Sequence, residues 1–181
     1  MVLKNLGLMG KMGSGKGFAA RYLAKKYNYK VITMGNFVRT LARKEKIKPT
    51  RENLEKLQKK YSKIYRHDYV IEKVIEKAKT MRGPLLLDGI RKPLQAKLAK
   101  KNLGTVLIEI YAAPKIRFER MKRRGRKSDS NAFEEFKKIE AQEDKIFGIN
   151  KTLRMADFKI NNDDGKQGLY SDLDKIIRSL R

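Results

Sequence analysis

The chain has 181 residues, a 40% apolar fraction and no cysteine, which argues against a wholly disordered protein and excludes a disulfide framework and cysteine-ligated zinc. The 45 Lys and Arg residues outnumber the 20 Asp and Glu residues, and the net charge of +25 attracts polyanions such as nucleotides, RNA, DNA or anionic membranes. A lysine-rich solvated surface is an equally good explanation of that charge. No stretch reaches the ~20 apolar residues of a membrane span and the start lacks a signal-peptide pattern, so we expect a cytoplasmic protein without a membrane partner.

In chain order, the pattern predicts strands that alternate with helices. Residues 3–9 form a mostly apolar strand, and Ala20, Leu23 and Tyr27 then recur at helical spacing. The later elements that we expect are a strand at 31–34, helices at 36–46, 49–64 and 71–78, a strand at 84–88, a helix at 94–101, a strand at 106–111, a basic helix at 117–124, a helix capped by Asn131 that runs to 147, a strand at 157–160 and a helix at 169–180. This alternation predicts an α/β fold in which one parallel sheet is covered on both faces, in a single domain spanning 1–181.

The segment between the first strand and the first helix, GKMGSGKG at residues 10–17, follows the phosphate-binding pattern G-x-x-x-x-G-K-[ST] at every position except the last. In such a loop, successive backbone N–H groups curl around a phosphate, and Lys16 neutralises charge on the transferred group. Gly17 lacks the hydroxyl that normally contacts Mg²⁺, and water is able to take that coordination position. We therefore predict an ATP and Mg²⁺ site; the alternative, a structural glycine turn, leaves the lysine unexplained.

A second motif, LLLDGIRKP, places Asp88 at the carboxyl end of the predicted third strand. Ligands bind at that edge of open α/β sheets, so Asp88 is our candidate metal-binding carboxylate, and Arg91 is close enough in sequence to hold a phosphate. The alternative is an acid that caps the next helix.

Two further segments carry candidate arginines. The motif TMGNFVR places Arg39 on the helix after the second strand, where it is either an acceptor-binding residue or an ordinary surface arginine. The segment KIRFERMKRRGRK places Arg117, Arg120 and Arg124 on one face of a helix, and arginine forks bind phosphate oxygens in pairs. We interpret this segment as a lid that closes over the donor nucleotide; a solvated basic helix or an RNA-binding strip remains the alternative.

Together these segments resemble the nucleoside monophosphate kinase group of P-loop kinases, and most of all the archaeal nucleotide kinases described as dephospho-coenzyme A kinase-like. The likeness runs nearly end to end, through GKMGSGKG, TMGNFVR, LLLDGIRKP, IYAAPKIRFERMKRRGR and ADFKINNDDG. It implies a three-layer α/β/α P-loop kinase fold with a five-stranded sheet, an acceptor-binding helical insert at about 35–80 and a lid at about 117–148. It also implies that the segment from Ala156-Asp157 to Asn161 lies near the adenine pocket.

The resemblance assigns the acceptor phosphate to Arg39 and Arg91. Asn36 stands where such sequences usually show Asp, and an amide cannot accept the proton of a hydroxyl acceptor. A phosphate acceptor needs no such base, so this departure favours a nucleoside monophosphate over dephospho-coenzyme A, although Asp88 or Asp68 could supply a base. The acceptor-site residues that we expect are Gly35, Asn36, Arg39, Gly89 and Arg91.

On the donor side, Lys16, Asp88, Arg120 and Arg124 are the residues expected to act in catalysis. The expected donor-nucleotide contacts are Gly10, Lys11, Met12, Gly13, Ser14, Gly15, Lys16, Gly17, Phe18, Arg120, Arg124 and Arg126. The predicted function is transfer of the γ-phosphoryl group of ATP to a nucleotide-like small molecule. The alternative that the net charge recommends is a nucleic-acid-associated ATPase, a polynucleotide kinase or an RNA-assembly factor.

Overall fold

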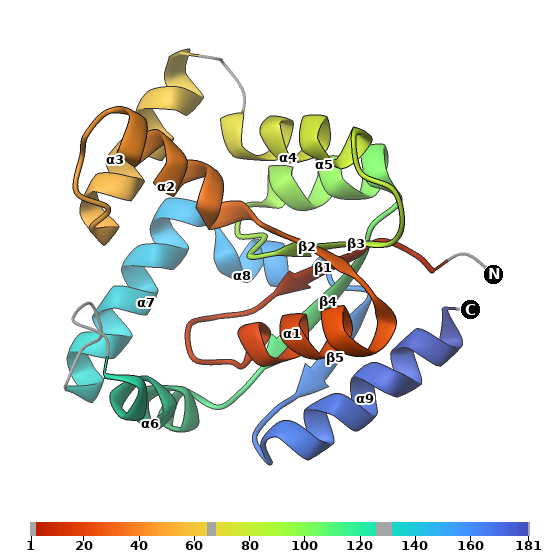
Figure 1. Cartoon of the computed structure of the whole chain (residues 1–181). Coiled ribbons are helices and arrows are strands. Elements are labelled where there is room, and N and C mark those ends of the chain that lie inside the picture. The colour runs from red at the N-terminus through yellow and green to blue at the C-terminus, as the bar shows by residue number, and fades with distance from the viewer. Residues whose placement is uncertain (1–2, 65–67, 126–131, 181) are drawn as a thin grey trace.

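Five short parallel strands form one sheet in the order β2-β3-β1-β4-β5 (Figure 1). The computed structural model describes residues 3–64, 68–125 and 132–180. The strands are β1 (Leu6–Met9), β2 (Lys30–Thr33), β3 (Leu85–Asp88), β4 (Val106–Tyr111) and β5 (Phe158–Asn161). Every neighbouring pair in this sheet is parallel, as the alternation of strands and helices predicts.

Helices connect the strands and cover both faces of the sheet, so the predicted three-layer α/β/α arrangement is confirmed. Their bounds are α1 (Lys16–Tyr27), α2 (Met34–Lys44), α3 (Arg51–Ile64), α4 (Tyr69–Lys79), α5 (Pro93–Leu103), α6 (Pro114–Arg124), α7 (Phe133–Phe147), α8 (Ile149–Leu153) and α9 (Lys166–Ser179). In Figure 1, α1 and α9 lie on one side of the sheet and α4 and α5 on the other.

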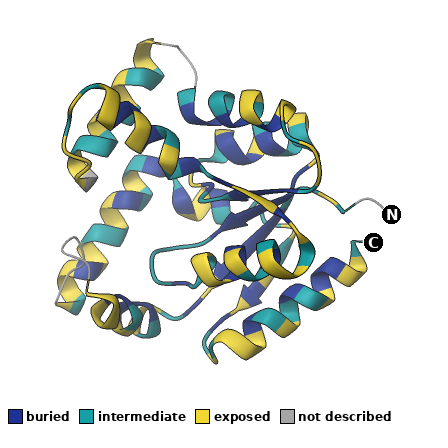
Figure 2. Cartoon of the chain, viewed as in Figure 1, coloured by how far each residue is buried: buried dark blue, intermediate teal, exposed yellow. Residues whose placement is uncertain are grey.

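The two faces of the sheet bury separate hydrophobic clusters. One cluster joins Leu8 and Ile108 to Leu23 of α1 and Leu173 of α9. The other joins strand residues such as Leu87 to α2, α4 and α5. The central strands are therefore buried on both faces (Figure 2), which explains why β1, β3 and β4 read as continuous apolar runs rather than as alternating ones.

The carboxyl ends of the strands meet at one edge, and α2, α3, α6 and α7 lie beyond that edge (left in Figure 1). The register pairs Leu8 with Asp88 and Thr33 with Asp88, which brings the loop after β1 beside the ends of β2 and β3. Parallel topology thus gathers the segments that the sequence motifs singled out.

Some of the observed bounds differ from the predicted ones. The strand predicted at 31–34 is Lys30–Thr33, because Met34 already begins α2. The cap predicted at Asn131 lies outside the described residues, and Ala132 is the N-cap of α7. The short helix α8 was not predicted. Within the described ranges, no helix is both long and apolar enough to cross a membrane.

Candidate functional site

The loop between β1 and α1 takes a backbone conformation that requires glycine. Gly10, Gly13 and Gly15 have φ angles of 149°, 75° and 104°, which L side chains rarely adopt. A Cβ at Gly13 would lie 2.6 Å from the carbonyl oxygen of Arg117, and a Cβ at Gly10 would collide with that of Ile110. The chain therefore curls tightly against β4 and α6, and α1 starts directly after this curl with its N-terminal N–H groups at the carboxyl edge of the sheet.

Lys16 folds back over the loop that precedes it. Its Nζ donates to the carbonyl oxygens of Gly10, at 2.7 Å, and Lys11, at 2.9 Å. The pKa of Lys16 is lowered from 10.5 to about 8, chiefly by burial and also by the charge of Arg91, although Asp88 and Glu143 act in the opposite direction. An anion bound at the loop would therefore stabilise the charged form of Lys16.

Asp88 ends β3 next to the loop, as the LLLDGIRKP motif predicts. Burial raises its pKa, while the charges of Lys16 and Arg91 lower it. In the part of the chain that the structure describes, no group of three or more His, Cys, Asp or Glu residues surrounds a possible metal position. Mg²⁺ needs few protein ligands when phosphates and water supply the rest, so Asp88 beside a phosphate-sized glycine curl fits that ion.

The arginines of α6 take two different roles. Arg120 donates to the carbonyl oxygens of Asn162, at 2.8 Å, and Asp163, at 3.3 Å, and its buried Nη1 has no hydrogen-bond partner. Burial lowers the pKa of Arg120, so an anion at the unpaired nitrogen is favourable. Arg124 also lines the cavity, and Arg126 lies outside the described residues.

Arg117 does not reach the cavity, although the sequence places it on the same helix face as Arg120 and Arg124. It is 3% exposed, donates to the carbonyl oxygens of Ala112 and Met12, and forms a two-point ion pair with Glu140 of α7. Arg117 therefore fastens α6 and α7 to the phosphate-binding loop.

One cavity of about 1020 Å³ joins these elements, at the upper end of the ~300–1,000 Å³ that ligand pockets span. Of the residues predicted to bind the donor, Met12, Gly13, Ser14, Gly15, Lys16, Gly17, Phe18, Arg120 and Arg124 line it. Of the residues predicted to bind the acceptor, Gly35, Arg39, Gly89 and Arg91 line it, and so does Asp88. The predicted residues Gly10, Lys11 and Asn36 do not line it. Asn36 is exposed and its Oδ1 accepts from Arg39 Nη1 at 3.1 Å, so it steadies Arg39.

Sequence reasoning missed several cavity residues from distant elements, and two of them, Glu143 and Asn162, contact other residues of the site. Glu143 of α7 is 5% exposed and its carboxylate lies 3.6 Å from Arg91 Nη1. Asn162, just after β5, donates through Nδ2 to the carbonyl oxygen of Ser14 at 2.7 Å. Neither carried a local signal, because each acts on a loop that lies far from it in the sequence.

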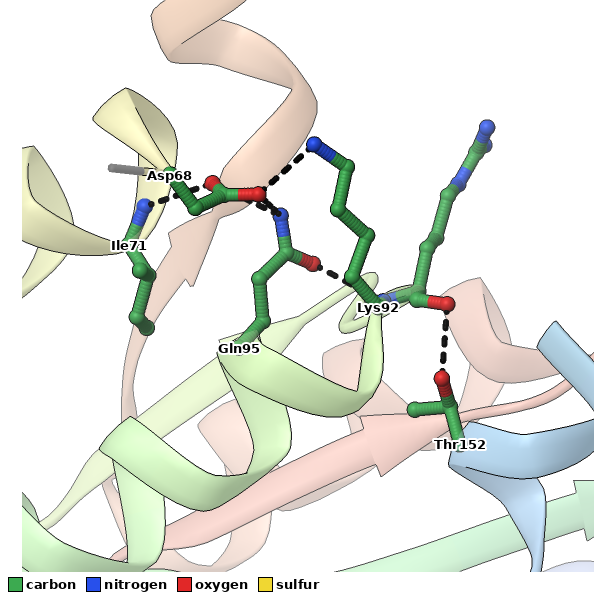
Figure 3. Close-up of polar contacts among 6 residues, drawn as sticks. Asp68, Ile71, Lys92, Gln95 and Thr152 are labelled. Carbon is green, nitrogen blue, oxygen red and sulfur yellow. Dashed lines mark hydrogen bonds and ion pairs between the residues drawn. The ribbon is translucent and has the colours of Figure 1, made fainter. Parts of the chain in front are cut away.

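A buried polar network holds the segment after β3 (Figure 3). Gln95 accepts through Oε1 from the backbone N–H groups of Arg91, at 3.0 Å, and Lys92, at 3.2 Å, and it donates through Nε2 to Asp68. Asp68 caps α4 by accepting from the N–H of Ile71 and pairs with Lys92 at 2.7 Å. Asp68, which we considered as a base, therefore has a structural position.

The segment from Ala156-Asp157 to Asn161 includes β5. Asp157 accepts from the N–H of Leu107 and pairs with Lys100 at 2.6 Å, at the amino end of β5. Asn162, the residue after the segment, lines the cavity, whereas residues 156–161 do not. The expectation that this segment lies near an adenine pocket stays a prediction.

Comparisons with known proteins identify relatives of this chain. A family model described as AAA domain matches residues 9–137. A UPF0200 protein of Staphylothermus marinus is 31% identical over 171 residues, covering 94% of this chain and 89% of the relative. A UPF0200 protein of Pyrococcus abyssi is 32% identical over 179 residues, covering 96% and 95%.

Solved structures show the same architecture. A shikimate kinase from Acinetobacter baumannii in complex with shikimate superposes with a TM-score of 0.62 at 18% identity, covering 98% of this chain and 92% of that one. A shikimate kinase from Bacteroides thetaiotaomicron superposes with a TM-score of 0.65 at 12% identity, covering 99% of both chains. These identities show a shared fold alone, and this chain has the P-loop kinase-like fold.

Proposed function

This chain belongs to the UPF0200 family and its residues 9–137 match the AAA domain; from that premise and the site geometry we propose that it is an ATP-dependent kinase that phosphorylates a nucleotide-like small molecule. The observation that carries the proposal is one continuous cavity. The same space is lined by the phosphate-binding loop with Lys16, by Asp88, by arginines of α6 and by acceptor-side residues of α2 and α3. A cavity that is lined both by Lys16, Arg120 and Arg124 and by Arg39 and Arg91 suits two anionic molecules, a donor and an acceptor, held side by side.

In this mechanism, positioning and charge neutralisation do the work. The β-phosphate of ATP accepts from the N–H groups of the loop and of the first turn of α1. Lys16 exchanges its two carbonyl partners for phosphate oxygens, and Arg120 and Arg124 neutralise the charge that develops on the transferred group. Asp88 would hold Mg²⁺ through water, and the ion would supply further neutralisation of the phosphate charge.

On the acceptor side, Arg39 and Arg91 bind the phosphate of the acceptor in this proposal. We favour a nucleoside monophosphate over dephospho-coenzyme A, because an anionic phosphate oxygen attacks without a general base and Asn36, outside the cavity lining, offers none. Glu143 pairs with Arg91 in the absence of acceptor, and an incoming phosphate takes its place as the partner of the guanidinium.

The test is phosphoryl transfer from radiolabelled ATP to a panel of acceptors: each nucleoside monophosphate, dephospho-coenzyme A and a short RNA. We expect transfer to one small acceptor, and a loss of at least about a hundredfold in Lys16→Ala. Lys25→Ala is the matched control, because Lys25 is an exposed lysine of the same helix and does not line the cavity. Equal transfer by the wild type and Lys16→Ala, or transfer to RNA alone, contradicts the proposal.

A further inference from the structure

The acceptor half of the cavity holds a buried hydrogen-bond acceptor without a partner. Gln58 of α3 lines the cavity, and its Oε1 is buried and makes no hydrogen bond. An unsatisfied buried oxygen costs free energy, so such atoms in native structures point to a missing partner. Because Gln58 lines a ligand-sized cavity, the partner that fits is a hydrogen-bond donor on the acceptor molecule, and an N–H group on the edge of a base is such a donor.

Two glutamines line the cavity, and Gln95 differs from Gln58 because its side-chain amide has hydrogen-bond partners. Its amide is fully engaged with the backbone of Arg91 and Lys92 on one side and with Asp68 on the other (Figure 3). Thr152 adds a hydrogen bond to the carbonyl oxygen of Arg91 at 2.8 Å. This network is complete without a ligand and fixes the backbone that carries Arg91, whereas Gln58 is left available.

The surroundings of Gln58 describe the rest of the acceptor. Leu54, one turn before Gln58 on α3, lines the same space as Val38 of α2 and Val70 of α4, which are 1% and 4% exposed. Glu55, three residues before Gln58 and so next to it on the helix surface, adds a carboxylate to the cavity wall. This half therefore offers apolar walls for a ring and the unpaired oxygen of Gln58 for the edge of that ring.

Two positively charged side chains also line this half of the cavity. Arg39 and Arg91 are cations that suit a phosphate group. A ligand that satisfies all three features has a flat apolar ring, N–H donors on its edge and an anionic end. From the proposed function, on which this step rests, we infer that the acceptor is a nucleoside monophosphate whose base carries an exocyclic amino group, and that Gln58 reads this group.

The test compares each amino-bearing nucleotide with an analogue that has hydrogen in place of the amino group. The pairs are AMP with purine riboside 5′-monophosphate, GMP with IMP, and CMP with the 2-pyrimidinone riboside monophosphate. Affinities are measured by calorimetry with the donor half saturated by a non-hydrolysable ATP analogue. In the wild type, we expect loss of the amino group to weaken binding of the preferred nucleotide by at least about tenfold.

Three variants separate a specific contact from a structural effect. In Gln58→Leu, the same pair should differ by less than twofold, because the acceptor oxygen is gone. Gln58→Glu retains an oxygen at this place and should retain the preference, as should Gln142→Leu, which removes an exposed glutamine that does not line the cavity.

The outcomes also distinguish this inference from the proposed function. If the ATP analogue binds but no amino-bearing monophosphate is preferred, or if the preference persists unchanged in Gln58→Leu, the inference about Gln58 is wrong and the kinase proposal stands. If the ATP analogue itself does not bind the wild type, the proposed function fails first.

Discussion

Lys16 is a partly buried lysine, and its burial disfavours the protonated side chain. Burial lowers its pKa to about 8, and a polyphosphate at the loop would raise that pKa again by supplying opposite charge. The nucleotide complex therefore holds more protons than the free protein between about pH 8 and the ordinary lysine pKa of 10.5. Nucleotide affinity should fall as the pH rises through this window.

The measurement is calorimetric titration of ATP into the protein at about pH 8.5, in two buffers with different ionisation enthalpies. The difference between the two observed enthalpies gives the number of protons taken up, and we expect most of one proton per nucleotide. Lys16→Met should bind more weakly and take up none. Proton uptake of the same size in Lys16→Met would assign the titration to another group.

Gly17 stands where the loop pattern has a hydroxyl, and the structure has room for one. A Cβ at this position would meet only Arg21 Nη1, at 3.7 Å, and Gly17 is an ordinary helical residue rather than one with positive φ. We expect Gly17→Ser to fold and to lower the Mg²⁺ concentration that gives half-maximal ATP turnover, because its hydroxyl replaces a water in the coordination shell. Gly17→Ala adds the same Cβ without the oxygen, and an identical shift in that variant would show that helix stability, not coordination, is responsible.

At the scale of elements, the ion pair between Arg117 and Glu140 joins α6 and α7 and also reaches the loop through Met12. The side chains are 3% and 11% exposed, so removal of one partner leaves a buried charge without compensation. We expect Glu140→Leu to lower the free energy of unfolding by about 3–5 kcal/mol, as measured by urea denaturation. The double variant Arg117→Met with Glu140→Leu should recover part of that loss.

An exposed pair on the same helix provides the control. Lys137 and Glu134 are 50% and 74% exposed in their ion pair, and removing Glu134 should change stability by less than about 1 kcal/mol. If Glu134→Leu and Glu140→Leu cost the same, the burial of the Arg117 pair does not contribute what we attribute to it.

Elements with a strong local pattern were predictable, and contacts between distant elements were not. The loop, β1 and α1 follow from glycine spacing and apolar periodicity within the first 27 residues, and β4 follows from its run of branched residues. The five-residue helix α8 is too short to show a period. Its position depends on Thr152 Oγ1, which donates to the carbonyl oxygen of Arg91, 61 residues earlier in the chain.

The candidate site divides in the same way. The motif residues Lys16 and Asp88 were predictable because each depends on its immediate neighbours in the sequence. Glu143 and Gln58 became site residues only when α7 and α3 were placed beyond the edge of the sheet, since a single acid or amide on an amphipathic helix usually faces solvent. Arg117 is the opposite case, a predicted phosphate-binding arginine that does not line the cavity. Helix periodicity predicted which face of the helix carries Arg117, but not the ion pair with Glu140 that holds the side chain away from the cavity.

At the scale of the whole molecule, the net charge of +25 attracts any polyanion, so it does not distinguish a nucleotide from RNA. Salt dependence does distinguish them. A nucleic acid that lies across an exposed basic surface neutralises several phosphates and releases their counterions, so its affinity falls by about 10³–10⁵ between 50 and 200 mM salt when 6–10 phosphates are contacted. A nucleotide inside the cavity meets Lys16 and Arg120 at partly buried positions, where salt screens less.

We therefore expect the affinity for a fluorescent ATP analogue to fall by less than about tenfold over the same range of salt. The parallel measurement is fluorescence anisotropy of a labelled single-stranded RNA under identical conditions. Lys16→Met should weaken binding of the analogue and leave RNA binding unchanged, because one partly buried lysine contributes little to a charge spread over the surface. Tight RNA binding that persists at 200 mM salt, together with ATP binding that disappears, would favour the nucleic-acid-associated ATPase instead.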